Sequence, residues 1–66
     1  MVQKIIDVVG TSDDSFASAA QNAVAEAAKT VRGMKWARVE QMELKIDGKR
    51  VAEYRVTVKI YFDVER

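Results

Sequence analysis

The chain of 66 residues contains no cysteine, no histidine and no proline, and it has a single tryptophan. Without cysteine and histidine, it lacks the disulfides and zinc sites that usually stabilise very small domains. A domain of this length buries only about 60% of the surface that its unfolded chain exposes, so oligomerisation is the remaining source of stability. Because 48% of the residues are apolar, disorder is excluded. We expect one compact domain over residues 1–66 that associates with its own copies.

Charge of one sign and long apolar runs are also missing. Eleven basic and ten acidic residues are interspersed and give a net charge of +1, so no strong field would attract nucleic acid or anionic lipid. No segment approaches the roughly 20 apolar residues of a membrane helix, and the first residues lack the apolar run of a signal peptide. We therefore expect a soluble, cytoplasmic protein that binds neither nucleic acid nor membrane.

The N-terminal segment predicts a strand that leads into a helix. Residues 2–9 are rich in β-branched side chains and stop at Gly10, which indicates a first strand with two partly apolar faces. Thr11, Ser12 or Asp13 can then cap a helix by accepting a hydrogen bond from one of its free N–H groups. The sequence therefore predicts that the helix begins at these residues.

Apolar side chains after this point recur at spacings of three and four, which is the pattern of a helix with one buried face. Alanine is abundant in the segment and favours a helix intrinsically. Lys29 and Arg32 suit the negative C-terminal end of the helix dipole, and Gly33 suits the left-handed position just past it. The expected buried positions are Phe16, Ala20, Ala23, Val24, Ala27 and Val31.

The second half of the chain predicts a long hairpin. Asp47 and Gly48 tolerate the positive φ angles of a type I′ turn between two strand-like runs. In residues 52–64 the even positions are apolar and the odd positions mostly polar, so the even positions are expected to face the helix. The whole chain is thus expected to be α+β, with β-α-β-β order and a three-stranded antiparallel sheet partly wrapped around one helix. Because a helical crossover makes the first two strands parallel, the last strand is expected between them.

A two-residue turn at positions 47 and 48 would set Val39 opposite Val56 and Ala37 opposite Val58, on the helix side. Trp36 and the apolar residues of the distal hairpin then fall on the other face. A strand of about 14 residues spans roughly 46 Å, and a helix of about 19 residues only roughly 28 Å. We expect copies of the chain to cover the overhanging apolar residues Met42, Leu44, Ile46 and Val51.

The sequence holds no familiar catalytic constellation, since acid–base or covalent catalysis would depend on Ser, Asp, Glu or Lys alone. We predict no enzymatic activity. Asp13 and Asp14 could hold Mg²⁺ or Ca²⁺, but favourable charge at a helix start is the simpler interpretation, and we predict no metal site. Trp36 is either an anchor of a subunit interface or a stacking surface for a planar ligand. Arg55 is expected on the same face, with Glu40 as a possible cross-strand partner.

Several motifs along the whole chain resemble the dodecin family. These are Val9-Gly10-Thr11-Ser12 with an acidic pair and Ser15-Phe16, then Trp36, then Glu53-Tyr54-Arg55-Val56-Thr57-Val58, and finally Phe62. The resemblance implies a hollow homododecamer built from trimers, with flavins bound in pairs between subunits. It further implies that Trp36 stacks on the isoalloxazine ring and that the family stores, buffers or quenches flavin.

One position departs from the pattern of flavin-binding dodecins, which typically carry Gln where this chain has Arg55. A Gln side chain both donates and accepts, whereas Arg only donates, so the ring N–H of the flavin would need another acceptor. Gln41 and Lys45 match positions that flank the ribityl chain, where acidic residues are more usual. Lys45 could attract a phosphate group, although a solvated charge is the simpler interpretation. Lys35, beside Trp36, completes the candidate cofactor-binding residues.

Two functions follow as hypotheses. The first is non-catalytic binding, storage or buffering of riboflavin, FMN or FAD in a homododecamer, between Trp36 residues of neighbouring subunits. The second is a dodecin-like cage that binds no flavin and carries or scaffolds another ligand, such as a nucleotide-like anion or a metal ion.

Overall fold

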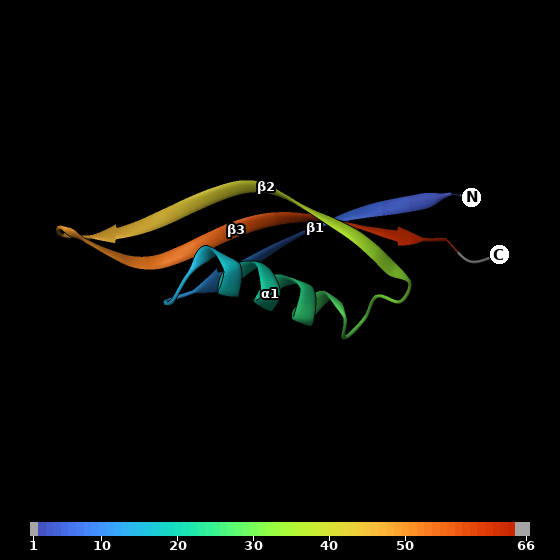
Figure 1. The fold of residues 1–66 in the computed structure, drawn as a ribbon, viewed down its shortest axis with the longest axis horizontal. Coiled ribbons are helices and arrows are strands. Elements are labelled where there is room, and N and C mark those ends of the chain that lie inside the picture. Colours follow the sequence, from blue (N-terminus) through green and yellow to red (C-terminus); the bar gives the residue numbers. More distant parts are fainter. Residues whose placement is uncertain (1, 65–66) are drawn as a thin grey trace.

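The computed structural model describes residues 2–64 and has the expected α+β architecture (Figure 1). Its elements are β1 (Gln3–Ser12), α1 (Phe16–Ala27), β2 (Met34–Asp47) and β3 (Arg50–Asp63). The sheet order is β1-β3-β2, and β3 runs antiparallel to both neighbours. The β-α-β-β topology and the central place of the last strand are therefore confirmed. Within the described residues, no helix is long and apolar enough to cross a membrane.

The helix begins later than the sequence indicates. Ser15 is the N-cap, with extended backbone angles, and its hydroxyl accepts a hydrogen bond from the Ser18 N–H at 3.0 Å. Thr11 and Ser12 belong instead to β1, which continues its pairing with β3 to the end of the motif. The Ser12 hydroxyl accepts from the Asp14 N–H at 3.0 Å and so shapes the turn before the helix. The prediction of a cap at positions 11–13 was wrong because a local hydroxyl motif cannot reveal how far strand pairing extends.

Gly10 does not end β1 but lies inside it, opposite Val56. A Cβ atom at this position would lie 2.1 Å from the Ala19 carbonyl oxygen and 2.8 Å from the Ala23 Cβ. Gly10 in the strand and the alanines on the helix therefore let the backbones of α1 and β1 come into direct contact. The side-chain amide of Asn22 adds a link by donating to the Thr11 carbonyl at 2.8 Å.

The helix also ends earlier than expected, at Ala27. The Thr30 and Val31 N–H groups both donate to the Ala27 carbonyl, which closes a final turn and leads the chain away from the helix axis. Both residues are β-branched, and such residues favour a helix less than the alanines before them. Gly33 does adopt the predicted left-handed conformation, with φ of +76°, but six positions beyond the last helical residue.

The core lies between α1 and the middle of the sheet. Val56, Val58 and Ile60 are almost fully buried, which confirms that the even positions of β3 face the helix there. At the start of the helix, the rings of Phe16 and Tyr54 meet edge to face with centroids 5.1 Å apart. The helix contributes Ala19, Ala23 and Ala27 to this core.

The hairpin register differs from the expected one. Asp47 pairs with Arg50, so the turn residues are Gly48 and Lys49. Only Gly48 has a positive φ, of 64°, which fits a type II′ turn with glycine at the first central position. Irregularities at Lys35, Glu40 and Ala52 each insert an extra residue into one strand, and a sequence that alternates smoothly gives no sign of such bulges.

These bulges change the faces of β2. Val39 and Ala37 stay on the helix side, opposite Val58 and Ile60, while Trp36 pairs with Tyr61 on the other side. Beyond the Glu40 bulge the pattern inverts, because an extra residue shifts a period of two. Met42 and Leu44 pair with Val56 and Tyr54 and therefore face the helix side, contrary to the prediction.

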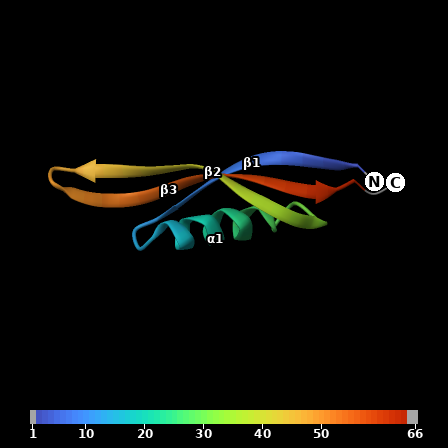
Figure 2. The same ribbon diagram turned by 45° about the horizontal axis from the view of Figure 1, so that its top comes forward.

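The hairpin nevertheless extends beyond the helix, and the molecule is elongated (Figures 1 and 2). A 12-residue helix spans about 18 Å, while the molecule measures 51 Å along its longest axis. Its radius of gyration is 13.5 Å, against about 11 Å for a compact domain of this length. The expectation of a compact domain was wrong for the single chain. The apolar residues of the overhang are exposed: Met42, Leu44, Ile46 and Val51.

Candidate functional site

Trp36 is the most conspicuous side chain near the start of β2. The Gly33 carbonyl accepts from the Asp63 N–H at 3.1 Å, which fixes this start against the end of β3. The Lys35 bulge follows, and Trp36 then pairs with Tyr61. The indole is 72% exposed in one chain. Large aromatic side chains are normally well buried, so this exposure indicates a surface that binds a ligand or another copy.

A cavity of about 290 Å³ lies beside Trp36, between α1 and β2. The helix packs mainly on β1 and β3, and β2 reaches this core through Met34. Lys35 also lines this cavity and is the one charged residue in its lining. The lining residues are Val24, Met34, Lys35, Trp36, Ala37 and Ile60.

A second cavity, of about 220 Å³, lies on the distal half of the hairpin and is lined by charged residues. Arg55 lies here, and its guanidinium pairs with Glu43, not with Glu40 as expected. Glu40 instead pairs with Arg38 at 3.1 Å, because its bulge removes it from the regular ladder. The lining residues are Glu43, Leu44, Lys45, Glu53 and Arg55.

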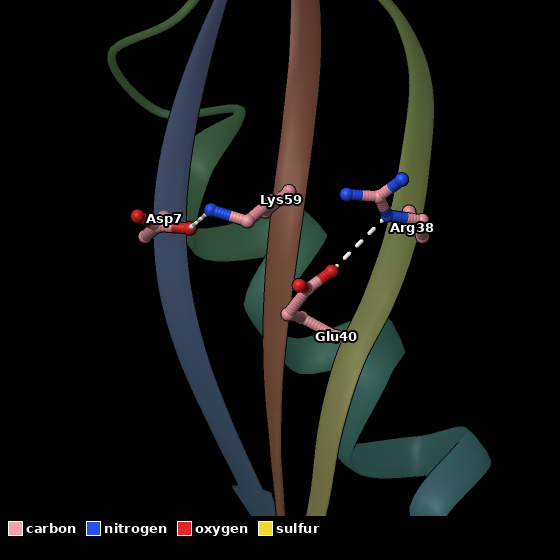
Figure 3. A network of polar contacts seen from close by, with 4 residues as sticks. All are labelled: Asp7, Arg38, Glu40 and Lys59. Atoms are coloured by element: carbon pink, nitrogen blue, oxygen red, sulfur yellow. Dashed lines mark hydrogen bonds and ion pairs between the residues drawn. The ribbon is translucent and has the colours of Figure 1, made fainter.

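Between these two regions a band of charge crosses the face of the sheet that α1 leaves open (Figure 3). Lys59 donates to Asp7 at 3.0 Å, and Arg38 donates to Glu40 at 3.1 Å. The hydrogen bond to the Asp7 carboxylate, and its charge, raise the pKa of Lys59 above its usual value. All four side chains are at least partly exposed, so these pairs contribute little stability.

The five candidate cofactor-binding residues therefore fall into three places. Lys35 and Trp36 share the first cavity, Lys45 and Arg55 share the second, and Gln41 pairs with Thr57 between them and lines neither. Six positions of β3 separate Tyr61, the partner of Trp36, from Arg55. At about 3.3 Å per residue this is roughly 20 Å. The backbones of Trp36 and Arg55 in one chain are therefore well separated along the sheet, and the two side chains line different cavities.

The acidic residues before the helix do not form an evident metal site. Asp13 lines a third cavity, of about 310 Å³, with Asp47 and Arg50 of the hairpin end. The backbone N–H of Asp14 donates a hydrogen bond to the Ser12 hydroxyl in the turn before the helix. Across residues 2–64, no group of three or more His, Cys, Asp or Glu side chains gathers in a way that could hold a metal ion.

The family of the chain follows from comparison with known proteins. The family model described as Dodecin matches residues 2–65. The chain belongs to the dodecin family. It is 36% identical over 64 residues to the dodecin of Thermus thermophilus, with 97% of this chain and 93% of the relative covered. A crystal structure of a Thermus thermophilus protein superposes with a TM-score of 0.93 at 35% identity, covering 98% of this chain and 96% of that one.

The name of a second dodecin relative includes a ligand, calcium. The chain is 34% identical over 61 residues to calcium dodecin of Mycobacterium tuberculosis, covering 92% of this chain and 86% of the relative. The dodecin family generally binds ligands without catalysis. Family membership thus fixes the fold and the general class of function, while the ligand depends on the residues at the site.

Glu43 lines the second cavity, and the sequence did not single it out. The expected register set it opposite Ala52, whereas the bulge at Ala52 and the shifted turn bring it opposite Arg55. Only the observed register reveals that Arg55 has a carboxylate as its direct partner.

Proposed function

We propose that this dodecin binds flavin without turning it over, and stores or buffers it at sites formed between copies in a hollow homododecamer. The observation that carries the proposal is the exposure of Trp36, a large aromatic side chain left 72% accessible in one chain. An exposed indole on a rigid strand suits stacking with the flat isoalloxazine ring.

Stacking between two indoles explains why the function would be binding and not catalysis. If Trp36 residues of two copies enclose a pair of flavins, each ring has one face on an indole and the other on the second flavin. A substrate then has no free face to approach. Base–aromatic stacking in proteins is worth about 1–3 kcal/mol, as measured by alanine substitution, which corresponds to roughly 5- to 150-fold in affinity.

The separation of the candidate residues supports a site made by more than one copy. The backbones at Trp36 and Arg55 of one chain lie roughly 20 Å apart along the sheet, and the two residues line separate cavities, which suits a site completed by a second chain. The single chain also has reason to associate, because its accessible surface is 5112 Å², against about 4200 Å² for a compact monomer of this mass.

The remaining candidate residues suit the polar parts of a flavin. Lys35, next to Trp36, lines the first cavity, and Lys45 lines the second together with Arg55. Lys35 would attract the phosphate of FMN or FAD as a point charge, whereas the charge of Lys45 is balanced by Glu53 across the ladder. Gln41, between them, offers an amide to the ribityl hydroxyls.

A fluorescence titration tests the proposal directly. Riboflavin or FMN is titrated with the purified protein, and the emission of the flavin and of the single Trp36 are followed together. Both emissions are expected to be quenched by binding when the protein and the flavin are mixed at micromolar concentrations. Trp36→Leu is expected to weaken binding by roughly 5- to 150-fold, while Trp36→Phe retains part of it. Flavin emission that stays unchanged with the wild-type protein would refute the proposal, and native mass spectrometry verifies that each variant assembles alike.

The alternative function is a cage that carries a nucleotide-like anion or a metal ion. The name of the calcium dodecin relative favours testing the metal ion. Asp13 and Asp47 share the third cavity and are the candidate oxygen ligands for Ca²⁺. Calorimetric titration with CaCl₂ separates the two functions, because saturable Ca²⁺ binding without any flavin binding would replace the flavin proposal with this one.

A further inference from the structure

Arg55 and Glu43 form a two-point ion pair across the hairpin. Arg55 Nε donates to Glu43 Oε1 at 3.3 Å, and Arg55 Nη2 lies 3.3 Å from Glu43 Oε2. The two residues are direct partners in the ladder, in a regular stretch between the bulges at Glu40 and Ala52. Both side chains are about half exposed, at 52% and 46%, so the pair is open to a ligand on the free face of the sheet.

The pair has hydrogen-bonding capacity left after this contact. A guanidinium carries five N–H donors and a carboxylate has about four acceptor positions, so one hydrogen bond and one further close contact leave most of them free. Both residues line the 220 Å³ cavity, where Lys45 faces Glu53 across the ladder. The lining therefore holds two positive and two negative charges. Such a balanced site suits a neutral polar edge that both donates and accepts better than it suits a free phosphate.

The imide edge of a flavin has this character, since its ring N3–H lies between two carbonyl groups. We propose that Glu43 accepts the hydrogen bond of the flavin N3–H while Arg55 donates to the adjacent carbonyl oxygen. Two residues in direct register would thus do together what one amide side chain does alone. This inference rests on the proposed flavin binding and adds Glu43 as a residue that determines specificity for the imide group.

The experiment compares riboflavin with 3-methylriboflavin, in which the N3 hydrogen is replaced by a methyl group. Dissociation constants of both are measured by fluorescence quenching for the assembled wild-type protein, Glu43→Ala, Glu43→Gln and a matched control, Glu40→Ala. Glu40 is a suitable control because it lies on the same strand as Glu43, pairs with an arginine of that strand, Arg38, and does not line the cavity. The ratio of the two constants isolates the N3–H contact from general effects on binding.

In the wild type, and in Glu40→Ala, methylation is expected to weaken binding by roughly 10- to 100-fold, as for a lost hydrogen bond to a charged group. In Glu43→Ala the ratio is expected to fall to about one. Riboflavin has no acceptor for its N3–H in this variant, so methylation removes no hydrogen bond, and the methyl group fits the space that the Glu43 side chain leaves. Glu43→Gln keeps an uncharged acceptor, so its ratio is expected to lie between these values.

A ratio in Glu43→Ala equal to that of the wild type would overturn the inference, since Glu43 would then only hold Arg55 in place. A wild-type ratio near one, with riboflavin bound, would overturn it as well and leave the flavin proposal intact. Failure of the wild type to bind riboflavin at all would instead remove the flavin proposal, and this inference with it.

Discussion

Substitution of Gly10 by alanine is expected to destabilise the fold severely, because it removes the close approach of α1 to the sheet. The new Cβ would lie 2.1 Å from the Ala19 carbonyl oxygen and 2.8 Å from both the Cβ and the backbone nitrogen of Ala23. An ordinary contact needs about 3.4 Å, so the helix would have to move by more than 1 Å. Most of these atoms are backbone, and no flexible side chain can move aside.

The displacement would open the core between α1 and β3, where Ala19, Ala23 and Val56 are at most 1% exposed. Overpacking a well-packed core costs about 1–3 kcal/mol, and more where backbone must shift. We expect a loss of at least about 3 kcal/mol in the free energy of unfolding. Urea denaturation followed by circular dichroism measures it, at one fixed protomer concentration because association contributes to apparent stability.

Gly48→Ala is the matched control. At Gly48 a Cβ would meet nothing within 4 Å, so its cost comes only from the positive φ of 64°. We expect about 1–2 kcal/mol for this conformational term. If Gly10→Ala were as stable as Gly48→Ala, or more so, the account of a steric limit between helix and strand would be refuted.

Three further predictions concern the cap, the charged band and the overhang. Ser15→Ala removes the N-cap acceptor and is expected to lower the free energy of unfolding by about 1 kcal/mol in urea denaturation; no change would argue against this cap. Asp7→Asn is expected to return the raised pKa of Lys59 toward its usual value, seen by NMR titration of the lysine carbons. Because that pKa is raised in the folded state, the stabilising contribution of the pair is present below about pH 10 and is lost as the pH rises through the raised value; an unmoved pKa would exclude Asp7 as the cause. Met42→Lys with Leu44→Lys places charge on the exposed apolar overhang and is expected to yield smaller species by native mass spectrometry, whereas an intact assembly would exclude this surface from the subunit contacts.

The order and topology of the elements were predictable because they follow from patterning over many residues. The alternation in β3 is regular enough to identify Val56 and Val58 as core positions, and both are buried. The helix boundaries were not predictable from the sequence, because several residues can serve as an N-cap. Ser15 was preferred over Thr11 since strand pairing extends to Ser12, and that pairing depends on contacts distant in sequence.

The site could be predicted only in part for a related reason. Trp36 lines a cavity with residues of α1 and β3, and its ladder partner is Tyr61 because the turn lies one position later than expected. Each bulge shifts the alternation by one residue and leaves no mark in the sequence. Consequently the partner of Arg55 was expected to be Glu40, and Glu43 was not recognised as part of the site.

The central claim is that flavin binds between copies of this chain through Trp36. Native mass spectrometry of the protein loaded with riboflavin tests it most directly, because it measures assembly and stoichiometry in one spectrum. The account predicts twelve chains with up to one flavin each, and an assembly of the same size without flavin for Trp36→Leu. A monomer in the wild-type spectrum, or flavin retained fully by Trp36→Leu, would contradict it.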